Sequence, residues 1–374
     1  MAQAKFIYDF PERNADLFYA ARFPCHDAII YFESRGKKFL VMSDLEIDRA
    51  KREAEVDKIL SLPVYTKRAE KKNKKFTIID VFHEIFSEQK IKNLTVPANT
   101  SFNLVDGLRR RGYKIEAGPA PFYPERFVKT PKERETIEKT QRLVFQAIGL
   151  AEKVLSAARI RGNRLFYRGR PLTSEWLRRM INVFLLEHDH IGADTIVAGG
   201  MDAIDPHEIG SGPLRPHQSI IVDVFPKSMK TMYYADATRT FCKGRAPDAL
   251  KKLYATVKEA QEMAISKVRA GVNGKTIHES ILKFFAEKGY KTGEANGRKQ
   301  GFIHGTGHSI GLEVHEEPAR IAARDFTLKK GYIMSVEPGL YYADIGGVRI
   351  EDLVYITKGG CRILGHYPKN LEIR

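Results

Sequence analysis

Short apolar runs separated by turn residues occupy the first part of the chain. They predict two strands and the turn between them, at 28–32, 39–42 and 34–38. The spacing within 45–62 predicts a helix, whereas 76–81 fits either a strand or the start of a helix. Prolines then gather between residues 119 and 124, as is typical of a boundary segment. We therefore expect a smaller mixed α/β domain over residues 1–126.

Amphipathic helices are predicted after this boundary. Thr130 is a favourable N-cap, Pro131 suits the first helical position, and Glu133 completes the pattern of a capping box. Apolar residues then recur at helical spacing as far as Leu155. Three further segments predict helices, at 174–188, 248–269 and 275–288. The second part of the chain therefore holds two pairs of helices.

Strand-like runs lie between and after these helix pairs, at 195–198, 219–223, 332–336 and 348–351. This order of helix pairs and strands indicates an α+β fold with a duplicated layout and a central antiparallel sheet, which we assign to residues 127–374. Acidic side chains stand at or just after the ends of several of these runs. A carboxylate that is buried must be compensated, and a metal ion is one such compensation.

Size and composition agree with two folded domains. The chain has 374 residues, of which 43% are hydrophobic. No apolar run approaches the roughly 20 residues that span a bilayer, and the first ten residues lack the apolar core of a secretory signal. The three cysteines are widely spaced and outside CxxC pairs, which favours free thiols over a zinc–thiolate site. We expect a cytoplasmic protein with no membrane partner.

The chain carries a formal net charge of +16, and two basic clusters contribute to it. One covers residues 67–75 and the other 159–170. We interpret both clusters as solvated surface. Neither a zinc finger nor an RNP-like motif accompanies them, and we expect no interleaved aromatic residues of the kind that proteins binding single-stranded nucleic acid carry. A nucleic acid partner is therefore not expected.

Candidate chemistry begins with Asp223 and Asp236. Asp223 closes an apolar run, and Asp236 follows across a hairpin that can bring the two carboxylates together. The two would repel each other unless cations lay between them. Because aspartate is also common at turns, this pair alone does not decide between a metal site and an ordinary hairpin.

Histidine and glutamate add to this pair. Three histidines fall within residues 304–315 of a chain that has eleven, and the glycines among them favour a loop or strand over a helical zinc motif. Glu337 and Glu351 each follow apolar strand residues directly. Carboxylates with one imidazole form an oxygen-rich set that suits manganese, cobalt, iron or zinc.

The order of these residues resembles a known family. The chain contains Asp…Asp-x-Thr-Arg-Thr…His-Gly-x-Gly-His-x-x-Gly-Leu-x-x-His-Glu…Glu-Pro-Gly…Arg-Ile-Glu-Asp between residues 223 and 352. This set resembles the pita-bread metallopeptidases, and more narrowly their branch of Xaa-Pro aminopeptidases and Xaa-Pro dipeptidases (prolidases). The resemblance covers residue 127 to the C-terminus, whereas the N-terminal part agrees in size and mixed α/β character with the creatinase/prolidase-like domain.

The resemblance implies a reaction and a set of roles. It implies two divalent ions, manganese first and cobalt, zinc or iron as alternatives, which would bind Asp223, Asp236, His308, Glu337 and Glu351. Glu337 would carry protons during hydrolysis, and His315 would stabilise the developing oxyanion. His207 would contact the substrate near the scissile bond. His304, Tyr341 and Arg349 match positions that line the proline-side pocket. The implied substrate is a peptide with proline at its second position, and the implied assembly is a homodimer.

Two other interpretations stay open at this stage. A methionine aminopeptidase would share the fold and the five ligands, although the N-terminal region, His304 and Arg349 count against it. A catalytically silent binding module would share the fold, although its ligand set is usually broken and here all five residues are present. The segment between Asp223 and Asp236 is longer than is usual in the family, and Phe225 replaces the usual glycine, which bears on substrate preference.

Overall fold

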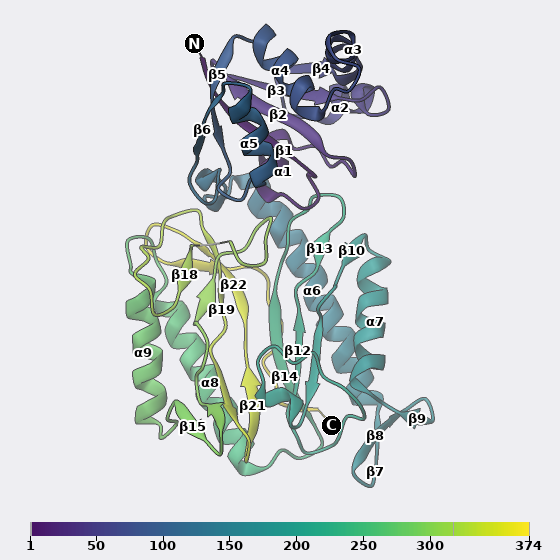
Figure 1. Cartoon of the computed structure of the whole chain (residues 1–374). Coiled ribbons are helices and arrows are strands. Elements are labelled where there is room, and N and C mark those ends of the chain that lie inside the picture. Colours follow the sequence, from purple (N-terminus) through teal and green to yellow (C-terminus); the bar gives the residue numbers. More distant parts are fainter. Residues whose placement is uncertain (1, 317, 374) are drawn as a thin grey trace. The chain divides into compact units, whose positions relative to one another are not determined.

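The computed structural model describes residues 2–316 and 318–373 and divides into two compact units, Met1–Arg126 and Phe127–Arg374 (Figure 1). In the first unit, six strands form one sheet with the order β4-β3-β2-β1-β5-β6. These strands are β1 (Ala2–Asp9), β2 (Ile29–Ser34), β3 (Lys37–Met42), β4 (Lys58–Ser61), β5 (Ile91–Val96) and β6 (Lys114–Ala117). The helices are α1 (Ala15–Ala21), α2 (Ile47–Glu53), α3 (Leu62–Lys72), α4 (Ile78–Glu88) and α5 (Phe102–Arg110). Strand β1 pairs antiparallel with β2 and parallel with β5, so the sheet is mixed.

Apolar side chains cover both faces of this sheet. Phe6 packs in one cluster with Phe86 of α4, and its neighbour Ile7 joins a second cluster with Leu17 of α1. Successive residues of a strand point to opposite faces, so a strand buried on both sides is apolar along its whole length. This explains why the run 28–32 shows no polar alternation.

The helix predicted over 45–62 is wrong. Helix α2 ends at Glu53, because Ala54 takes up an extended conformation with φ −74° and ψ 138°. Strand β4 follows, and Pro63 then lies in the first turn of α3, where its missing N–H leaves no hydrogen bond unmade. The undecided segment 76–81 contains the start of α4, and the Thr77 side chain and Asp80 form a capping box there.

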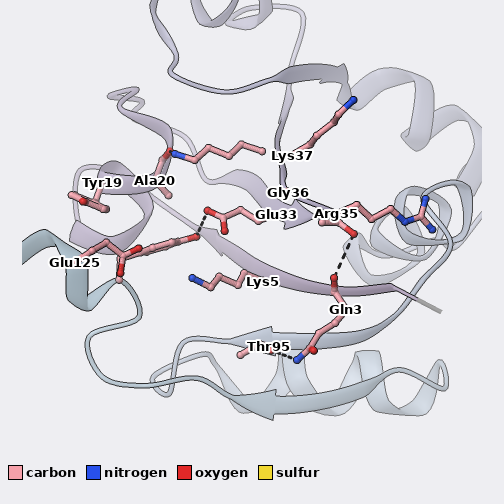
Figure 2. Close-up of a pocket in the computed structure, with 13 residues that line it drawn as sticks. Gln3, Lys5, Tyr19, Ala20, Glu33, Arg35, Gly36, Lys37, Thr95 and Glu125 are labelled. Atoms are coloured by element: carbon pink, nitrogen blue, oxygen red, sulfur yellow. Dashed lines mark hydrogen bonds between the residues drawn. The ribbon is translucent and has the colours of Figure 1, made fainter.

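A cavity of about 700 Å³ opens on the first unit beside β1, β2 and α1 (Figure 2). Its charged groups are partly engaged within the unit. Glu33 accepts hydrogen bonds from the Tyr31 and Tyr123 hydroxyls at 2.6 and 2.9 Å. The Lys5 ammonium lies 4.4 Å from the centre of the Tyr123 ring. The cavity therefore presents a mixture of acidic and basic groups.

The second unit contains two helix pairs and the strands between them (Figure 1). The helices are α6 (Pro131–Ala157), α7 (Ser174–Leu186), α8 (Asp248–Lys267) and α9 (Gly274–Glu287), with a short 3-10 turn at Asp202–Ile204. Another 3-10 turn, Pro124–Phe127, spans the boundary between the two units in the chain. Helices α6 and α7 pack on β11, β12 and β14, and α8 and α9 pack on β18, β19, β20 and β21. The predicted N-terminus of α6 is confirmed, since Thr130 and Glu133 form its capping box.

The strands of this unit are short. They are β7 (Arg159–Arg161), β8 (Arg164–Tyr167), β9 (Arg170–Pro171), β10 (His190–Ile191), β11 (Ile196–Gly199), β12 (Ile220–Val224), β13 (Lys227–Ser228), β14 (Ala237–Lys243), β15 (Gly293–Ala295), β16 (Arg298–Gln300), β17 (Gly307–His308), β18 (Arg320–Ile321), β19 (Ile333–Val336), β20 (Gly339–Tyr342), β21 (Gly346–Arg349), β22 (Asp352–Ile356), β23 (Cys361–Ile363) and β24 (Glu372–Ile373). The predicted strand 348–351 is interrupted, because β21 ends at Arg349 and β22 begins at Asp352.

Two strand groups meet in the middle of this unit. One has the order β11-β12-β14-β24, and the other has the order β19-β22-β23. The Glu351 amide donates to the Thr238 carbonyl at 3.1 Å, which joins the gap between β21 and β22 to β14. The predicted antiparallel pairing is found between β11, β12 and β14 and between β19 and β22. Among the described residues, we find no helix with the length and apolarity needed to cross a bilayer.

Candidate metal centre

The five predicted ligands come from strand ends that converge. Asp223 lies near the end of β12, and Asp236 directly precedes β14, which pairs antiparallel with β12. His308 ends β17, Glu337 follows β19, and Glu351 occupies the gap between β21 and β22. All five side chains line one cavity of about 390 Å³. Strand pairing therefore brings residues that are far apart in sequence into one cavity.

Distances within the cavity define a compact cluster. Asp236, His308 and Glu351 each offer one ligand atom within 4.8 Å of the others. The His308 Nε2 atom lies 3.2 Å from Glu337 Oε1 and 3.9 Å from Asp236 Oδ2. The other ring nitrogen of His308 lies 3.3 Å from the Ser309 carbonyl, so it carries the proton in that contact. Nε2 therefore faces the carboxylates of Glu337 and Asp236.

Neighbouring hydroxyl groups orient two of the carboxylates. Ser335 donates to Glu337 Oε1 at 3.0 Å and accepts from the His308 amide at 3.0 Å. Thr238 donates to Glu351 Oε2 at 2.8 Å. Neither residue was predicted as a site residue, although Ser335 lies within a predicted strand run and Thr238 within the Asp-x-Thr-Arg-Thr motif. Their hydroxyls fix the rotamers of the acids they touch.

Three carboxylate oxygens in the cluster are buried without a hydrogen-bond partner among the described residues, namely Asp223 Oδ1, Asp236 Oδ1 and Glu351 Oε1. A buried, unpaired carboxylate oxygen is costly unless a cation neutralises it. Oxygen donors with one imidazole are the chemistry that divalent transition ions accept. The residues present therefore fit divalent metal ions.

The pKa values in the cluster diverge. Burial raises the pKa of Asp236 and of Glu351, and the surrounding carboxylates raise both further. Burial also raises the pKa of Glu337, but the hydrogen bond from His308 and the nearby positive charges outweigh it and hold this pKa to about 2. Glu337 is therefore ionised, whereas its two neighbours resist ionisation unless a cation is present.

Arg349 connects the ligands to the rest of the cavity. Its guanidinium donates to Asp223 Oδ2 at 2.7 Å, to Thr238 Oγ1 at 3.2 Å, to the Pro206 carbonyl at 3.1 Å and to the Tyr341 hydroxyl at 3.0 Å. Pro206 precedes His207, which also lines the cavity. Arg349 therefore holds Asp223 and the loop of His207 through one planar group.

Tyr341 and His304 extend this chain of hydrogen bonds. Burial lowers the pKa of His304 to about 4, so the ring is neutral near pH 7. Its Nδ1 lies 2.8 Å from the Gly305 carbonyl and carries the proton, and its Nε2 accepts from the Tyr341 hydroxyl at 2.9 Å. His304 lines the cavity, and Tyr341 lies behind it against Arg349. His315 also lines the cavity, with its ring 4.3 Å from that of His308.

Apolar side chains complete the wall. Ile196, Phe225 and Val314 line the cavity together with the polar residues. Phe225 belongs to the long connection after β12, and the residues that follow it form β13, which pairs antiparallel with β10. The lengthened segment between Asp223 and Asp236 thus adds a small two-stranded sheet and places an aromatic ring at the cavity. The sequence singled out Phe225 as a departure that bears on substrate preference, and the structure adds that Phe225 lines the cavity.

A second buried network lies behind the centre. Arg239 donates to the Glu351 carbonyl at 2.6 Å, to Asp352 Oδ1 at 2.7 Å and to the Tyr367 carbonyl at 3.0 Å. Lys369 pairs with Asp352 at 2.7 Å. Burial raises the pKa of Asp352, but these two cations outweigh it and leave the pKa below its usual value. The backbone at Glu351 is therefore held from behind by a later segment of the chain.

Known peptidases are similar to this chain in sequence or in structure, over about half of its length or over nearly all of it. It is 29% identical to the Xaa-Pro dipeptidase of Pyrococcus horikoshii over 337 residues, which cover 89% of this chain and 85% of the relative. It is 36% identical to the uncharacterized peptidase YqhT of Bacillus subtilis over 185 residues, which are 50% of each chain. The crystal structure of X-Pro aminopeptidase from Thermotoga maritima superposes with a TM-score of 0.81 at 25% identity, covering 99% of this chain and 97% of that one.

The predicted pita-bread α+β fold is confirmed by these structures. The prolidase of Pyrococcus horikoshii has the same fold, with a TM-score of 0.78 at 23% identity over 99% of this chain and 95% of that one. Residues 143–358, more than half of the chain, match the metallopeptidase family M24. This segment contains all five residues of the candidate metal centre. The chain therefore belongs to metallopeptidase family M24.

Proposed function

We propose that this protein is an exopeptidase that hydrolyses the bond between an N-terminal residue and a following proline. The observation that carries the proposal is the single cavity of about 390 Å³ in which the five acidic and imidazole ligands face His207, His304, His315 and Arg349. Relatives named Xaa-Pro dipeptidase and X-Pro aminopeptidase support it. An imide bond to proline has no N–H, so a dedicated site must recognise the ring by shape.

Asp223, Asp236, His308, Glu337 and Glu351 would hold two divalent ions, manganese first and cobalt, zinc or iron as alternatives. When bound, the ions would polarise the scissile carbonyl and make water acidic enough to react near neutral pH. Their charge also matches the three unpaired carboxylate oxygens of Asp223, Asp236 and Glu351. Thr238 and Ser335 keep two of the acids in one orientation each.

Side chains of the cavity then handle protons and position the peptide. Glu337 is ionised, so it can accept a proton from attacking water and pass it to the leaving secondary amine nitrogen of proline. His315 and His207 line the same cavity and can donate hydrogen bonds to the carbonyl oxygen as its negative charge develops. His304 is neutral and held by Tyr341, so it offers an uncharged edge to the proline ring.

A substrate panel tests this proposal. We expect the manganese- or cobalt-loaded enzyme to cleave Ala-Pro or Ala-Pro-Ala, with kcat/KM at least about 100-fold above that for Met-Ala-Ser. Comparing dipeptides with tripeptides then separates a dipeptidase from an aminopeptidase. Preference for Met-Ala-Ser would favour a methionine aminopeptidase. Metal loading without turnover of any Xaa-Pro peptide would refute the proposed activity.

We also propose a homodimer that works in the cytoplasm. The described cysteines support a reducing compartment, because Cys25, Cys242 and Cys361 are free and Cys25 and Cys242 are buried. Sedimentation velocity of the metal-loaded protein tests the dimer, and a single species with the mass of one chain, 42.5 kDa, would contradict it.

A further inference from the structure

A basic plate of three strands follows α6, formed by β7, β8 and β9 over Arg159–Pro171. Residues 153–174 contain Lys153, five arginines and no acidic residue. The arginines are Arg159, Arg161, Arg164, Arg168 and Arg170, and all are exposed. Within the described part of the chain, none of these guanidinium groups has a carboxylate partner. Figure 1 places the plate at the outer edge of the second unit, near the start of α7.

The arginines of one face repel one another. Arg161 and Arg164 are direct cross-strand partners, and Arg159 faces Phe166. Cross-strand partners and alternate residues of a strand share a face, so three arginines surround one aromatic ring. Like charges directly opposite each other destabilise a strand pair. A bound polyanion would remove this repulsion, which no acidic side chain of the plate relieves.

Aromatic rings lie among these arginines. The Arg161 guanidinium lies 5.3 Å from the centre of the Phe166 ring, and that of Arg170 lies 3.8 Å from the Trp176 ring. Tyr167 packs against Trp176 with ring centres 5.6 Å apart. We predicted that the basic clusters lack interleaved aromatic residues, and for residues 159–170 these rings show that the prediction is wrong. Phe166, Tyr167 and Trp176 are partly exposed. Arginine beside accessible aromatic rings is the combination that binds phosphates and stacks on bases.

The plate is anchored rather than loose. Leu165 is fully buried, and its amide donates to the Leu214 carbonyl at 3.0 Å. Gly162 and Asn163 form its exposed tip, which offers no large apolar side chain for insertion into a lipid bilayer. A fixed, charged plate with a polar tip fits a flexible polyanion that can adapt to it.

The other basic cluster, at residues 67–75, provides a contrast. Arg68 pairs with Glu88, and Lys72 pairs with Glu84 at 2.7 Å. Carboxylates thus neutralise part of that cluster, as expected for a solvated surface. Lys71, Lys74 and Lys75 are exposed on the same cluster, so they offer a matched set of three charges to remove.

We propose that the β7–β9 plate binds single-stranded nucleic acid. Arg159, Arg161 and Arg164 contact the phosphate backbone, and Phe166 stacks on a base. This goes beyond the peptidase activity and does not depend on it, because no residue of the plate lines the cavity of the metal centre. The plate also gives a use to part of the net charge of +16.

Fluorescence anisotropy with labelled 15-nucleotide RNA and DNA of one mixed sequence tests the proposal in full-length protein. We expect R159Q/R161Q/R164Q to weaken binding at least about tenfold and to reduce the slope of log K against log salt by about 2, since each phosphate contact on a single strand contributes about 0.7. K71Q/K74Q/K75Q removes the same charge and should change binding less than about twofold. Equal losses in the two variants would overturn the proposal in favour of net charge.

Phe166 separates base stacking from charge alone. Phe166→Ala should weaken oligonucleotide binding about tenfold, Phe166→Tyr should not, and heparin binding should be the same in both variants. Thermal melts identify any variant that has lost its fold, and Phe166→Tyr then carries the comparison. Binding of either the RNA or the DNA oligonucleotide supports the proposal, and the one that binds more tightly identifies the type of nucleic acid that the plate prefers. Stronger binding to duplex DNA, heparin or phosphatidylserine vesicles than to single strands, or wild-type affinity of Phe166→Ala, would overturn it.

Discussion

Removing the divalent ions should make the stability of this enzyme depend steeply on pH. Without cations, burial and neighbouring carboxylates raise the pKa of Asp236 and Glu351 in the folded state. The folded protein then binds more protons than the unfolded chain, so stability falls as pH rises from about 4 towards the folded pKa values. Glu337 has a folded pKa of about 2, so its contribution is lost only as pH falls below about 4.5 and stays constant above pH 5.

The magnitude follows from the number of retained protons. Each such carboxyl changes the free energy of unfolding by about 1.4 kcal/mol per pH unit, so the two together give at most about 2.7 kcal/mol. For a unit of this size, 1 kcal/mol corresponds to about 2 °C in Tm. His304 has the opposite sign, because its lowered pKa of about 4 adds stability as pH rises to about 6.5. Since it acts with or without metal, it cancels in the difference.

Differential scanning fluorimetry at pH 5.5, 6.5 and 7.5, with chelator or with saturating manganese, measures this difference. We expect the Tm gap between the two samples to widen by up to about 5 °C per pH unit. Asp236→Asn should halve the widening, and its fold should persist because the backbone of residue 236 is held by Gln141 at 2.9 and 3.1 Å. A gap that stays constant or narrows with pH would refute the reasoning about buried carboxylates.

Three further changes test how the site is supported. Arg349→Lys cannot reproduce four guanidinium contacts and should lose about 3 kcal/mol of transition-state stabilisation, roughly 100-fold in kcat/KM with normal Tm; near-normal kcat/KM would contradict this. A Cβ at Gly307 would lie 2.0 Å from the Ser335 carbonyl oxygen. The clash would displace Ser335, which orients His308 and Glu337, so Gly307→Ala should weaken metal binding about tenfold in calorimetry. An unchanged metal affinity would contradict this prediction. Lys129 and Glu316 form a fully buried ion pair, so Lys129→Met should lower unfolding free energy by about 3–5 kcal/mol in urea titrations, with a smaller loss in K129M/E316Q. Equal losses would show that the unpaired charge is not the cause.

The sequence was most informative where a residue type has few alternatives. Helix α6 was predicted from its cap because Thr130, Pro131 and Glu133 act on neighbours within one turn. The carboxylates alone were ambiguous, and the metal ligands were proposed because the order of all five with their neighbours resembles a known family. By contrast, 45–62 has one helical spacing but folds as a helix, a strand and a second helix. The conformation of Ala54 and pairing with β3 decide the break, and neither appears in a local pattern.

Contacts between distant residues could not be predicted. Thr238 and Glu351, or Ser335 and His308, meet through pairing of strands far apart in sequence. The neutral state of His304 depends on its burial, and Tyr341 lies behind His304 and Arg349 rather than among the residues that line the cavity. Phe225 reaches the cavity because the inserted residues pair with β10. Each outcome depends on packing in three dimensions, which periodicity does not encode.

The hold of Arg239 on the backbone of Glu351 and Asp352 bears on when the enzyme becomes active during its synthesis. Arg239 donates to the Tyr367 carbonyl, and Lys369 neutralises Asp352. A ribosome adds both of these residues after every ligand of the centre, and folding of the growing chain waits for segments still inside the exit tunnel. The metal centre therefore reaches its final geometry only after Tyr367 and Lys369 have left the exit tunnel, which is later than the emergence of the last ligand.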